Sequence, residues 1–109
     1  MTMDASPRTW VGIFDQPNFG EYPVMLTLGD FIRVDYPSLP CGGFLTLEKI
    51  EGDTAYLRER ITYGQGTCRD GVEVQLSKQN GQLRFVVVLQ DGSAGGEGRL
   101  SPVPPPTHK

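Results

Sequence analysis

The sequence predicts an all-β protein, in which the chain forms a small up-and-down antiparallel barrel of about eight strands. Hydrophobic residues occur in short runs throughout the 109 residues, and 14 glycines and 9 prolines separate these runs at frequent turns. This pattern is typical of all-β domains. Successive strands joined by short turns form a meander, and about eight strands can close on themselves and so remove the exposed edges. A two-sheet β-sandwich is the alternative.

Turn signals divide the first four strands. A polar loop, residues 15–21, ends the first strand, and the tight turn Gly29-Asp30 makes the second and third strands antiparallel neighbours. Between the third and fourth strands, two prolines, Cys41 and the pair Gly42-Gly43 predict that the backbone turns a corner. These four strands are residues 8–14, 23–28, 31–36 and 44–50.

The last four strands follow in the same way. Residues 51–53 form a turn by composition, and residues 64–71 form a loop. Asn80-Gly81 is the strongest short hairpin signal in the chain, and Asp91-Gly92 turns once more into a glycine-rich last strand. These four strands are residues 54–63, 72–77, 82–90 and 94–100.

The length fits one domain. We expect residues 1–7 to be a disordered lead-in, residues 8–101 to be the barrel and residues 102–109 to be a proline-rich disordered tail. Prolines cannot donate hydrogen bonds to a sheet, so the last strand should end near Leu100.

Several classes of function lack their usual signals. The net charge is −3 and lysine and arginine are scattered singly, so we expect no nucleic-acid binding. No apolar run approaches the ~20 residues that span a membrane. The only histidine is His108, and the two cysteines do not form a CxxC pair, so we expect no metal site and no cysteine nucleophile with its base. No cofactor motif is present, and we expect no enzyme activity.

Glu59 is the most informative single residue. Strand alternation places it on the inward face with Leu57 and Ile61. A carboxylate in apolar surroundings needs an arginine partner or hydrogen bonds, or its pKa rises. Glu59 is therefore either an acid that faces a ligand inside the barrel, or part of a structural ion pair or a strand end near solvent.

Cys41 and Cys68 lie before and after the hairpin of residues 44–63. A hairpin brings the ends of its strands together, so we expect the two thiols to meet and form a disulfide, which would stabilise the fold by roughly 3–4 kcal/mol. The alternative is a pair of thiols kept reduced. A disulfide favours a periplasmic or secreted location and reduced thiols a cytoplasmic one. Residues 1–6 have neither a basic nor an apolar region, so we expect no signal peptide.

Trp10 and Arg99 suggest how the barrel closes. They lie in the first and last strands, which are neighbours in a closed barrel, so the guanidinium can stack on the indole. This resembles the Trp–Arg closure of calycins, the superfamily of lipocalins and fatty-acid-binding proteins, although the order here is Trp10-Val11-Gly12 rather than Gly-x-Trp. We expect the interior to be filled, leaving little room for a ligand, by Val24, Leu26, Leu45, Leu47, Leu57, Ile61, Val74, Leu76, Phe85 and Val87.

A second likeness covers about residues 10–103. The elements Tyr36-Pro37-Ser38-Leu39, Cys41-Gly42-Gly43, Glu59-Arg60-Ile61 and Gly66-x-Cys68-x-Asp70-Gly71 resemble a small two-cysteine bacterial β domain. That domain occurs as an extracytoplasmic module of some actinobacterial Ser/Thr kinases and in free-standing proteins. The resemblance implies an exported sensor or binding domain, with Cys41 paired to Cys68 and without enzyme activity.

Three functions remain open. The first is a non-catalytic module that recognises a protein or a cell-envelope component through its loops and outer face. The second is a calycin-like carrier of a small apolar ligand with Glu59 in its cavity, and the third is a small inhibitor or immunity protein that plugs an enzyme with one loop. Aromatic and arginine side chains supply most interface hot spots. The candidate contact residues are five aromatic residues that we expect to be exposed and three arginines: Phe19, Tyr22, Tyr36, Tyr56, Tyr63, Arg58, Arg60 and Arg69.

Overall fold

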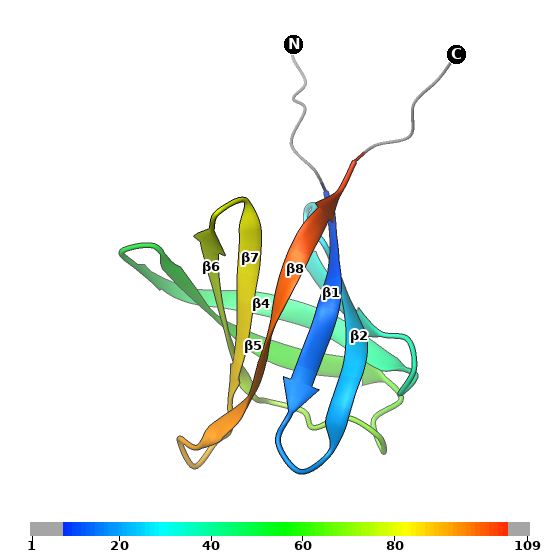
Figure 1. Cartoon of the computed structure of the whole chain (residues 1–109). Coiled ribbons are helices and arrows are strands. Elements are labelled where there is room, and N and C mark those ends of the chain that lie inside the picture. Colours follow the sequence, from blue (N-terminus) through cyan, green and yellow to red (C-terminus); the bar gives the residue numbers. More distant parts are fainter. Residues whose placement is uncertain (1–7, 105–109) are drawn as a thin grey trace, which may run out of the picture.

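The computed structural model describes residues 8–104, and eight antiparallel strands form one closed barrel in this part of the chain (Figure 1). Each strand pairs with the next one, and β1 also pairs with β8, which closes the barrel. The predicted barrel is confirmed, and the sandwich is not formed. The strands are β1 (Thr9–Gln16), β2 (Gly20–Thr27), β3 (Ile32–Tyr36), β4 (Cys41–Glu51), β5 (Thr54–Tyr63), β6 (Glu73–Gln79), β7 (Gln82–Val88) and β8 (Ala94–Val103).

Local chemistry explains the tightest turns. Asn80 and Gly81, between β6 and β7, have φ angles of 54° and 81°. A two-residue hairpin of type I′ requires positive φ at both positions, and asparagine followed by glycine adopts these angles at the least cost. The hairpin predicted from Asn80-Gly81 is therefore confirmed.

The first hairpin is tighter than the sequence suggested. β1 continues to Gln16 and β2 begins at Gly20, so only three residues form the turn where a polar loop of residues 15–21 was expected. Asp15 pairs with Glu21 across the two strands, and both side chains are exposed. Polar residues here mark the solvent-facing ends of strands, because the backbone groups remain paired in the ladder.

Gly42 and Gly43 belong to β4 and not to the corner, which is formed by residues 37–40. The backbones of β4 and β5 approach so closely that a Cβ on Gly43 would lie 1.8 Å from the carbonyl oxygen of Arg60. The register shifts between these two glycines. Glycine is thus required at both positions because the strands are in close contact there. The sequence had instead predicted a turn at these two glycines.

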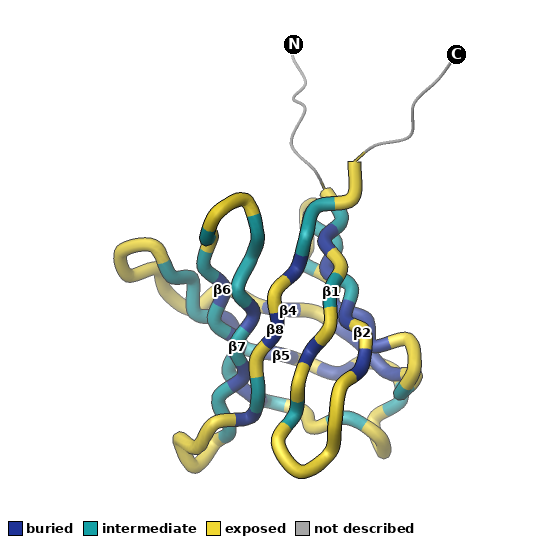
Figure 2. The backbone as a smooth tube through the Cα atoms, in the orientation of Figure 1, coloured by how far each residue is buried: buried dark blue, intermediate teal, exposed yellow. Residues whose placement is uncertain are grey.

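Buried and exposed positions alternate along the strands, and the buried ones face the barrel interior (Figure 2). Nine of the ten predicted interior residues are buried, but Leu47 is 51% exposed. The last pair between β3 and β4 is Ile32 with Leu45, so Leu47 lies beyond the end of β3. The β4–β5 hairpin projects past its neighbour there, and the inward side of β4 has nothing to pack against.

β8 continues three residues past Leu100, the expected end of the sheet. Leu100 pairs with Leu83, the last pair with β7, whereas Pro102 still pairs with Trp10 of β1. Residues 101–103 thus have a neighbour on one side only, and proline is tolerated on such an edge. The predictions for residues 1–7 and 105–109 lie outside the described residues.

The expected contact between Trp10 and Arg99 is wrong, although β1 and β8 are neighbours. Arg99 pairs with Ile13, and both side chains are exposed on the outside of the barrel. Trp10 lies an odd number of residues from Ile13, so it points inward, where it is buried. Lys78, and not Arg99, lies over its ring, with the ammonium nitrogen 6.0 Å from the centroid.

Candidate functional site

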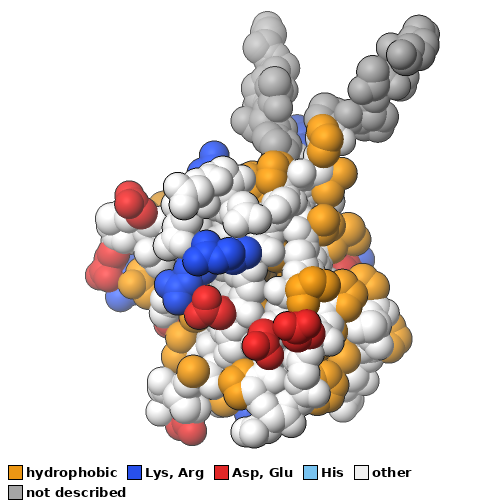
Figure 3. Space-filling model, viewed as in Figure 1, with side chains coloured by type: hydrophobic (Ala, Val, Ile, Leu, Met, Phe, Trp, Pro, Cys, Tyr) orange, Lys and Arg blue, Asp and Glu red, His pale blue; other side chains and the backbone are white. Residues whose placement is uncertain are grey.

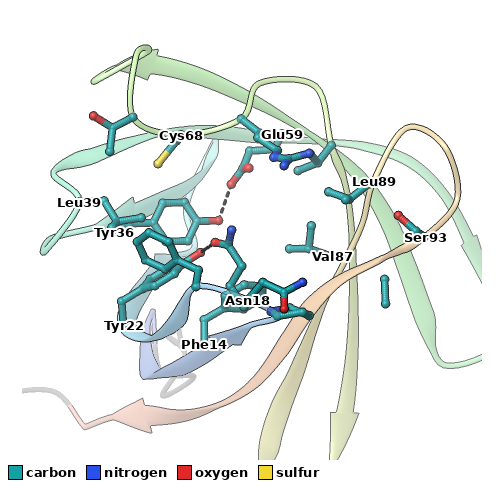
Figure 4. Close-up of a pocket in the computed structure, with 18 residues that line it drawn as sticks. Phe14, Asn18, Tyr22, Tyr36, Leu39, Glu59, Cys68, Val87, Leu89 and Ser93 are labelled. Atoms are coloured by element: carbon teal, nitrogen blue, oxygen red, sulfur yellow. Dashed lines mark hydrogen bonds between the residues drawn. The ribbon is translucent and has the colours of Figure 1, made fainter.

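One end of the barrel is hollow. A pocket of about 560 Å³ is lined by residues of the β1–β2, β3–β4, β5–β6 and β7–β8 connections (Figure 4). These connections lie at the end of the barrel opposite the one at which β1 begins and β8 finishes (Figure 1). The prediction of a filled interior is therefore wrong at this end. The pocket is lined by Phe14, Gln16, Pro17, Asn18, Phe19, Tyr22, Tyr36, Leu39, Glu59, Thr67, Cys68, Arg69, Val72, Val87, Leu89, Ser93, Ala94 and Gly95.

Small residues form part of the pocket wall. β8 begins with Ala94 and Gly95, and both line the pocket. A Cβ on Gly95 would lie 2.7 Å from a methyl carbon of Val87. At Ala94 and Gly95, β8 therefore contributes no large side chain to the pocket wall, and Val87 of β7 packs against the glycine backbone.

Glu59 lies in the wall of this pocket. Its side chain is buried, with the residue only 3% exposed, as the strand alternation predicted. The Tyr36 hydroxyl donates a hydrogen bond of 2.5 Å to Oε2 (Figure 4). Among residues 8–104, Glu59 forms no ion pair, and its Oε1 accepts no hydrogen bond from a protein group. The structural ion pair considered from the sequence is not formed.

The surroundings of Glu59 change its acidity. Burial raises the pKa of this carboxyl to about 7, the Tyr36 hydrogen bond opposes that rise, and the nearby negative charge of Asp70 adds to it. Burial and the charge of Glu59 also raise the pKa of Tyr22 to about 12, so its hydroxyl is neutral at physiological pH. The pocket therefore contains an acid that changes charge near neutral pH.

Aromatic rings form the opposite wall. Tyr22 contacts Phe14, Phe19 and Tyr36, with ring centroids 5.5, 5.6 and 5.9 Å apart. Its hydroxyl donates a hydrogen bond of 2.6 Å to Oε1 of Gln16, which holds the ring in place. Such tilted and edge-to-face pairs stabilise one another beyond the area they bury. The wall is thus ordered before any ligand arrives.

Cys41 and Cys68 form the predicted disulfide, with Cα atoms 6.2 Å apart and positions 27 residues apart in sequence. Cys41 is buried at the start of β4, and Cys68 lies in the β5–β6 loop, where it lines the pocket. Two backbone bonds shape the same loop, because the amides of Thr67 and Cys68 donate to the carbonyl of Gly64. The disulfide thus anchors one lip of the pocket to the sheet.

The predicted contact residues separate into two groups. Phe19, Tyr22, Tyr36 and Arg69 line the pocket. Tyr22 and Tyr36 were expected to be exposed, but they are buried, with exposed fractions of 8% and 5%. They share the inward face of their strands with Val24 and Val34. Phe14, Gln16, Asn18, Leu89 and Ser93 were not predicted. The inward alternation that places Tyr22 beside Val24 was the signal for the aromatic wall.

The other four predicted residues lie outside the pocket and are engaged by neighbours. Arg58 pairs with Glu48 at 2.9 Å, and Arg60 lies 3.8 Å from Asp70. Tyr63 donates a hydrogen bond to Asp35, and Lys49 lies over the ring of Tyr56 at 4.8 Å. These residues do not come together into one contact surface.

Comparisons of this chain with protein-family models, with curated proteins and with solved structures give no match. Within residues 8–104, no group of three histidine, cysteine, aspartate or glutamate side chains lies close enough to hold a metal ion. The same residues include no helix that is both long and apolar enough to cross a membrane.

The Tyr36→Phe variant tests the geometry of the acid. Because the Tyr36 hydrogen bond lowers the pKa of Glu59, its loss should raise that pKa further, above about 7. The measurement is a carbon-13 NMR titration of the Glu59 carboxyl. Tyr22→Phe is the matched control, since it removes a hydroxyl that is bonded to Gln16. An equal shift in both variants, or none in Tyr36→Phe, would contradict the hydrogen bond.

Proposed function

We propose that this protein binds a small molecule, largely apolar with one polar group, in the open end of its barrel. The observation that carries this proposal is the pocket of about 560 Å³ with Glu59 as a buried carboxyl that has no cationic partner among the described residues. Binding sites for small molecules typically measure about 300–1,000 Å³ and combine apolar walls with a few polar groups.

The composition of the walls supports the proposal. Phe14, Tyr22, Val87 and Leu89 supply apolar area, while Glu59 and Tyr36 supply polar atoms at one place. Burying an ionisable side chain without an opposite charge costs free energy, and such a residue in a cavity is a candidate for a functional site. A carrier or small-molecule sensor uses this combination without any catalytic step.

The disulfide supports a location outside the cytoplasm as part of the same proposal. Disulfides persist in oxidising compartments, and cytosolic reductants keep most thiols reduced. Cys41 and Cys68 are paired, and the described residues contain no free cysteine. We infer a periplasmic or secreted binding protein.

A neutral apolar fluorophore, N-phenyl-1-naphthylamine, provides the test. We expect its emission to rise and saturate at one molecule per chain. The Leu89→Trp variant should weaken this binding at least tenfold, because a larger ring at the pocket wall fills the space the probe needs. The measurement is a fluorescence titration, with folding checked by circular dichroism.

Ile13→Trp is the matched control. Ile13 is 51% exposed on the outer face of β1, so the same added ring should leave probe binding unchanged. Binding that survives Leu89→Trp, or that both variants weaken equally, would place the probe elsewhere on the protein. The absence of any saturable binding would overturn the proposed function.

Protein recognition is the second candidate, and the outer face favours it. Phe31 is 75% exposed and packs against Phe44 with ring centroids 6.0 Å apart. On another face, apolar side chains gather over β1 and β2, among them Val11 and Ile13 (Figure 3). Exposed apolar groups of this kind mark interaction sites when they are contiguous. The third function considered from the sequence, an inhibitor or immunity protein, stays a prediction.

A further inference from the structure

The geometry points to an organic cation as the ligand: a molecule with a protonated amine that donates a hydrogen bond to Oε1 of Glu59, and with an apolar body that packs on the aromatic wall. This inference rests on the proposed function and specifies the chemical class of its ligand. It would make the pocket selective for amines over alcohols and carboxylic acids of the same shape.

The arrangement of the carboxyl is the first reason. The Tyr36 hydroxyl donates a hydrogen bond to Oε2 of Glu59, and the carboxyl lies beside the open space of the pocket (Figure 4). Oε1 has no hydrogen-bond donor among residues 8–104, and an ionised carboxylate accepts several hydrogen bonds. An ammonium group supplies both the missing donor and the missing positive charge, which a hydroxyl does not.

The aromatic wall is the second reason. Tyr22 and Tyr36, from β2 and β3, pack edge to face with ring centroids 5.9 Å apart. The exposed Phe19 extends the wall towards the mouth, and the buried Phe14 extends it towards the core. The faces of aromatic rings attract cations, and the attraction is stronger where water is excluded. Both tyrosine hydroxyls stay neutral, because burial raises their pKa values, so the wall adds no negative charge of its own.

Other charged groups also lie near the pocket. Asp70, in the β5–β6 loop, adds negative potential at Glu59. Arg69 is the one cation that lines the pocket within the described residues; it is exposed and interacts with Asp91 of the β7–β8 connection. Arg69 thus belongs to the rim, and the buried part of the pocket is acidic. An anionic ligand held by Arg69 is the competing outcome.

Three ligands with the same hydrocarbon chain test the selectivity: decylamine, 1-decanol and decanoate. Each displaces bound N-phenyl-1-naphthylamine at pH 8, where Glu59 is ionised and the amine is charged. We expect decylamine to bind at least about tenfold more tightly than decanol, because charge-assisted hydrogen bonds are roughly twice as strong as neutral ones. Decanoate should bind most weakly. Equal affinities, or tightest binding of decanoate, would overturn the inference while leaving the proposed function intact.

The Glu59→Gln variant should remove the preference for decylamine and keep the binding of decanol. Glu97→Gln is the control for a general loss of negative charge, since Glu97 is exposed on the outer face and paired with Arg84. If both variants lose the preference equally, the amine responds to net charge and not to this site. If wild type binds neither the fluorophore nor any of the three ligands, the proposed function itself fails.

Wild type alone gives an independent readout that needs no variant. The affinity for decylamine should rise about tenfold per pH unit as the pH increases from 5 towards 7, and should level off near pH 8. Glu59 ionises over this range while the amine stays protonated. Burial keeps the pKa values of Tyr22 and Tyr36 above this range, and Asp70 and Arg69 are exposed at the rim. A flat profile for decylamine would contradict a direct contact with Glu59.

Discussion

The variant Cys41→Ala/Cys68→Ala will lower the free energy of unfolding by about 3–4 kcal/mol. Cys41 and Cys68 are 27 residues apart in sequence, and in the chain-entropy model a crosslink over a loop of this length stabilises the folded state by about that amount. For a domain of this size, each kcal/mol corresponds to about 4 °C or more in Tm, so we expect a decrease of at least about 12 °C. Urea unfolding and a thermal scan provide the two measurements.

Loss of the disulfide should also loosen one lip of the pocket. The amides of Thr67 and Gly71, which donate to backbone carbonyls in the β5–β6 loop and β5, should exchange with solvent faster in the variant. Gln79, at the opposite end of the barrel, serves as the reference within the same molecule. A variant as stable as wild type would contradict the predicted role of the disulfide. After the change in global stability is subtracted, an equal increase in exchange at Thr67, Gly71 and Gln79 would contradict a local effect on the loop.

The Glu59→Gln variant will be more stable than wild type above pH 7 and equally stable near pH 4. Burial raises the pKa of Glu59 from an ordinary value of 4.5 to about 7. Between these two values the folded protein holds a proton that the unfolded chain has released, so the stability of wild type falls as the pH rises. A shift of this size corresponds to about 3 kcal/mol at pH 8. Glutamine carries no charge, and its amide oxygen can still accept the Tyr36 hydrogen bond.

The measurement is urea unfolding of both proteins at intervals from pH 4 to pH 8.5. The difference between them isolates Glu59, because the other ionisable groups are shared. Glu97→Gln is the control of opposite sign: its ion pair with Arg84 lowers the pKa of Glu97, so removing the charge should destabilise the protein at neutral pH. A difference between wild type and Glu59→Gln that does not change with pH would mean that Glu59 is not desolvated in the folded protein.

Together, the two experiments distinguish the contribution of the disulfide to stability from that of Glu59. The disulfide stabilises the fold at every pH, whereas Glu59 costs stability as it ionises. Proteins often retain such a cost at binding sites, because a ligand that supplies the missing partner recovers it. A ligand of the inferred class should therefore raise the Tm of wild type more at pH 8 than at pH 5.

Much of the fold was predictable because the signals for it are local. Alternation along the strands and the turn at Asn80-Gly81 depend on neighbouring residues only, and they led to eight antiparallel strands in the observed order. The pairing of Cys41 with Cys68 followed from the hairpin between them. The inward direction of Glu59 followed from its position in β5.

The pocket was not predictable from the same signals. Alternation states which side chains point inward, but it does not state whether they fill the space, which depends on side-chain volumes from every strand at one level of the barrel. The pocket is lined by residues from distant segments, among them Phe14, Val87 and Ala94, and only their joint packing leaves the space between them unfilled. Likewise, Trp10 and Arg99 lie in neighbouring strands, but the register between β1 and β8 turns one inward and the other outward.

By itself, the sequence determined the strands, their order, the closure of the barrel and the orientation of Glu59, because backbone sterics and apolar periodicity act over a few residues. Only the tertiary structure decided that Tyr36, 23 residues away in sequence, is the partner of Glu59, that Oε1 is left without one, and that a cavity lies beside it. Those features depend on register and packing between distant segments. The same packing buries the carboxyl and so raises its pKa.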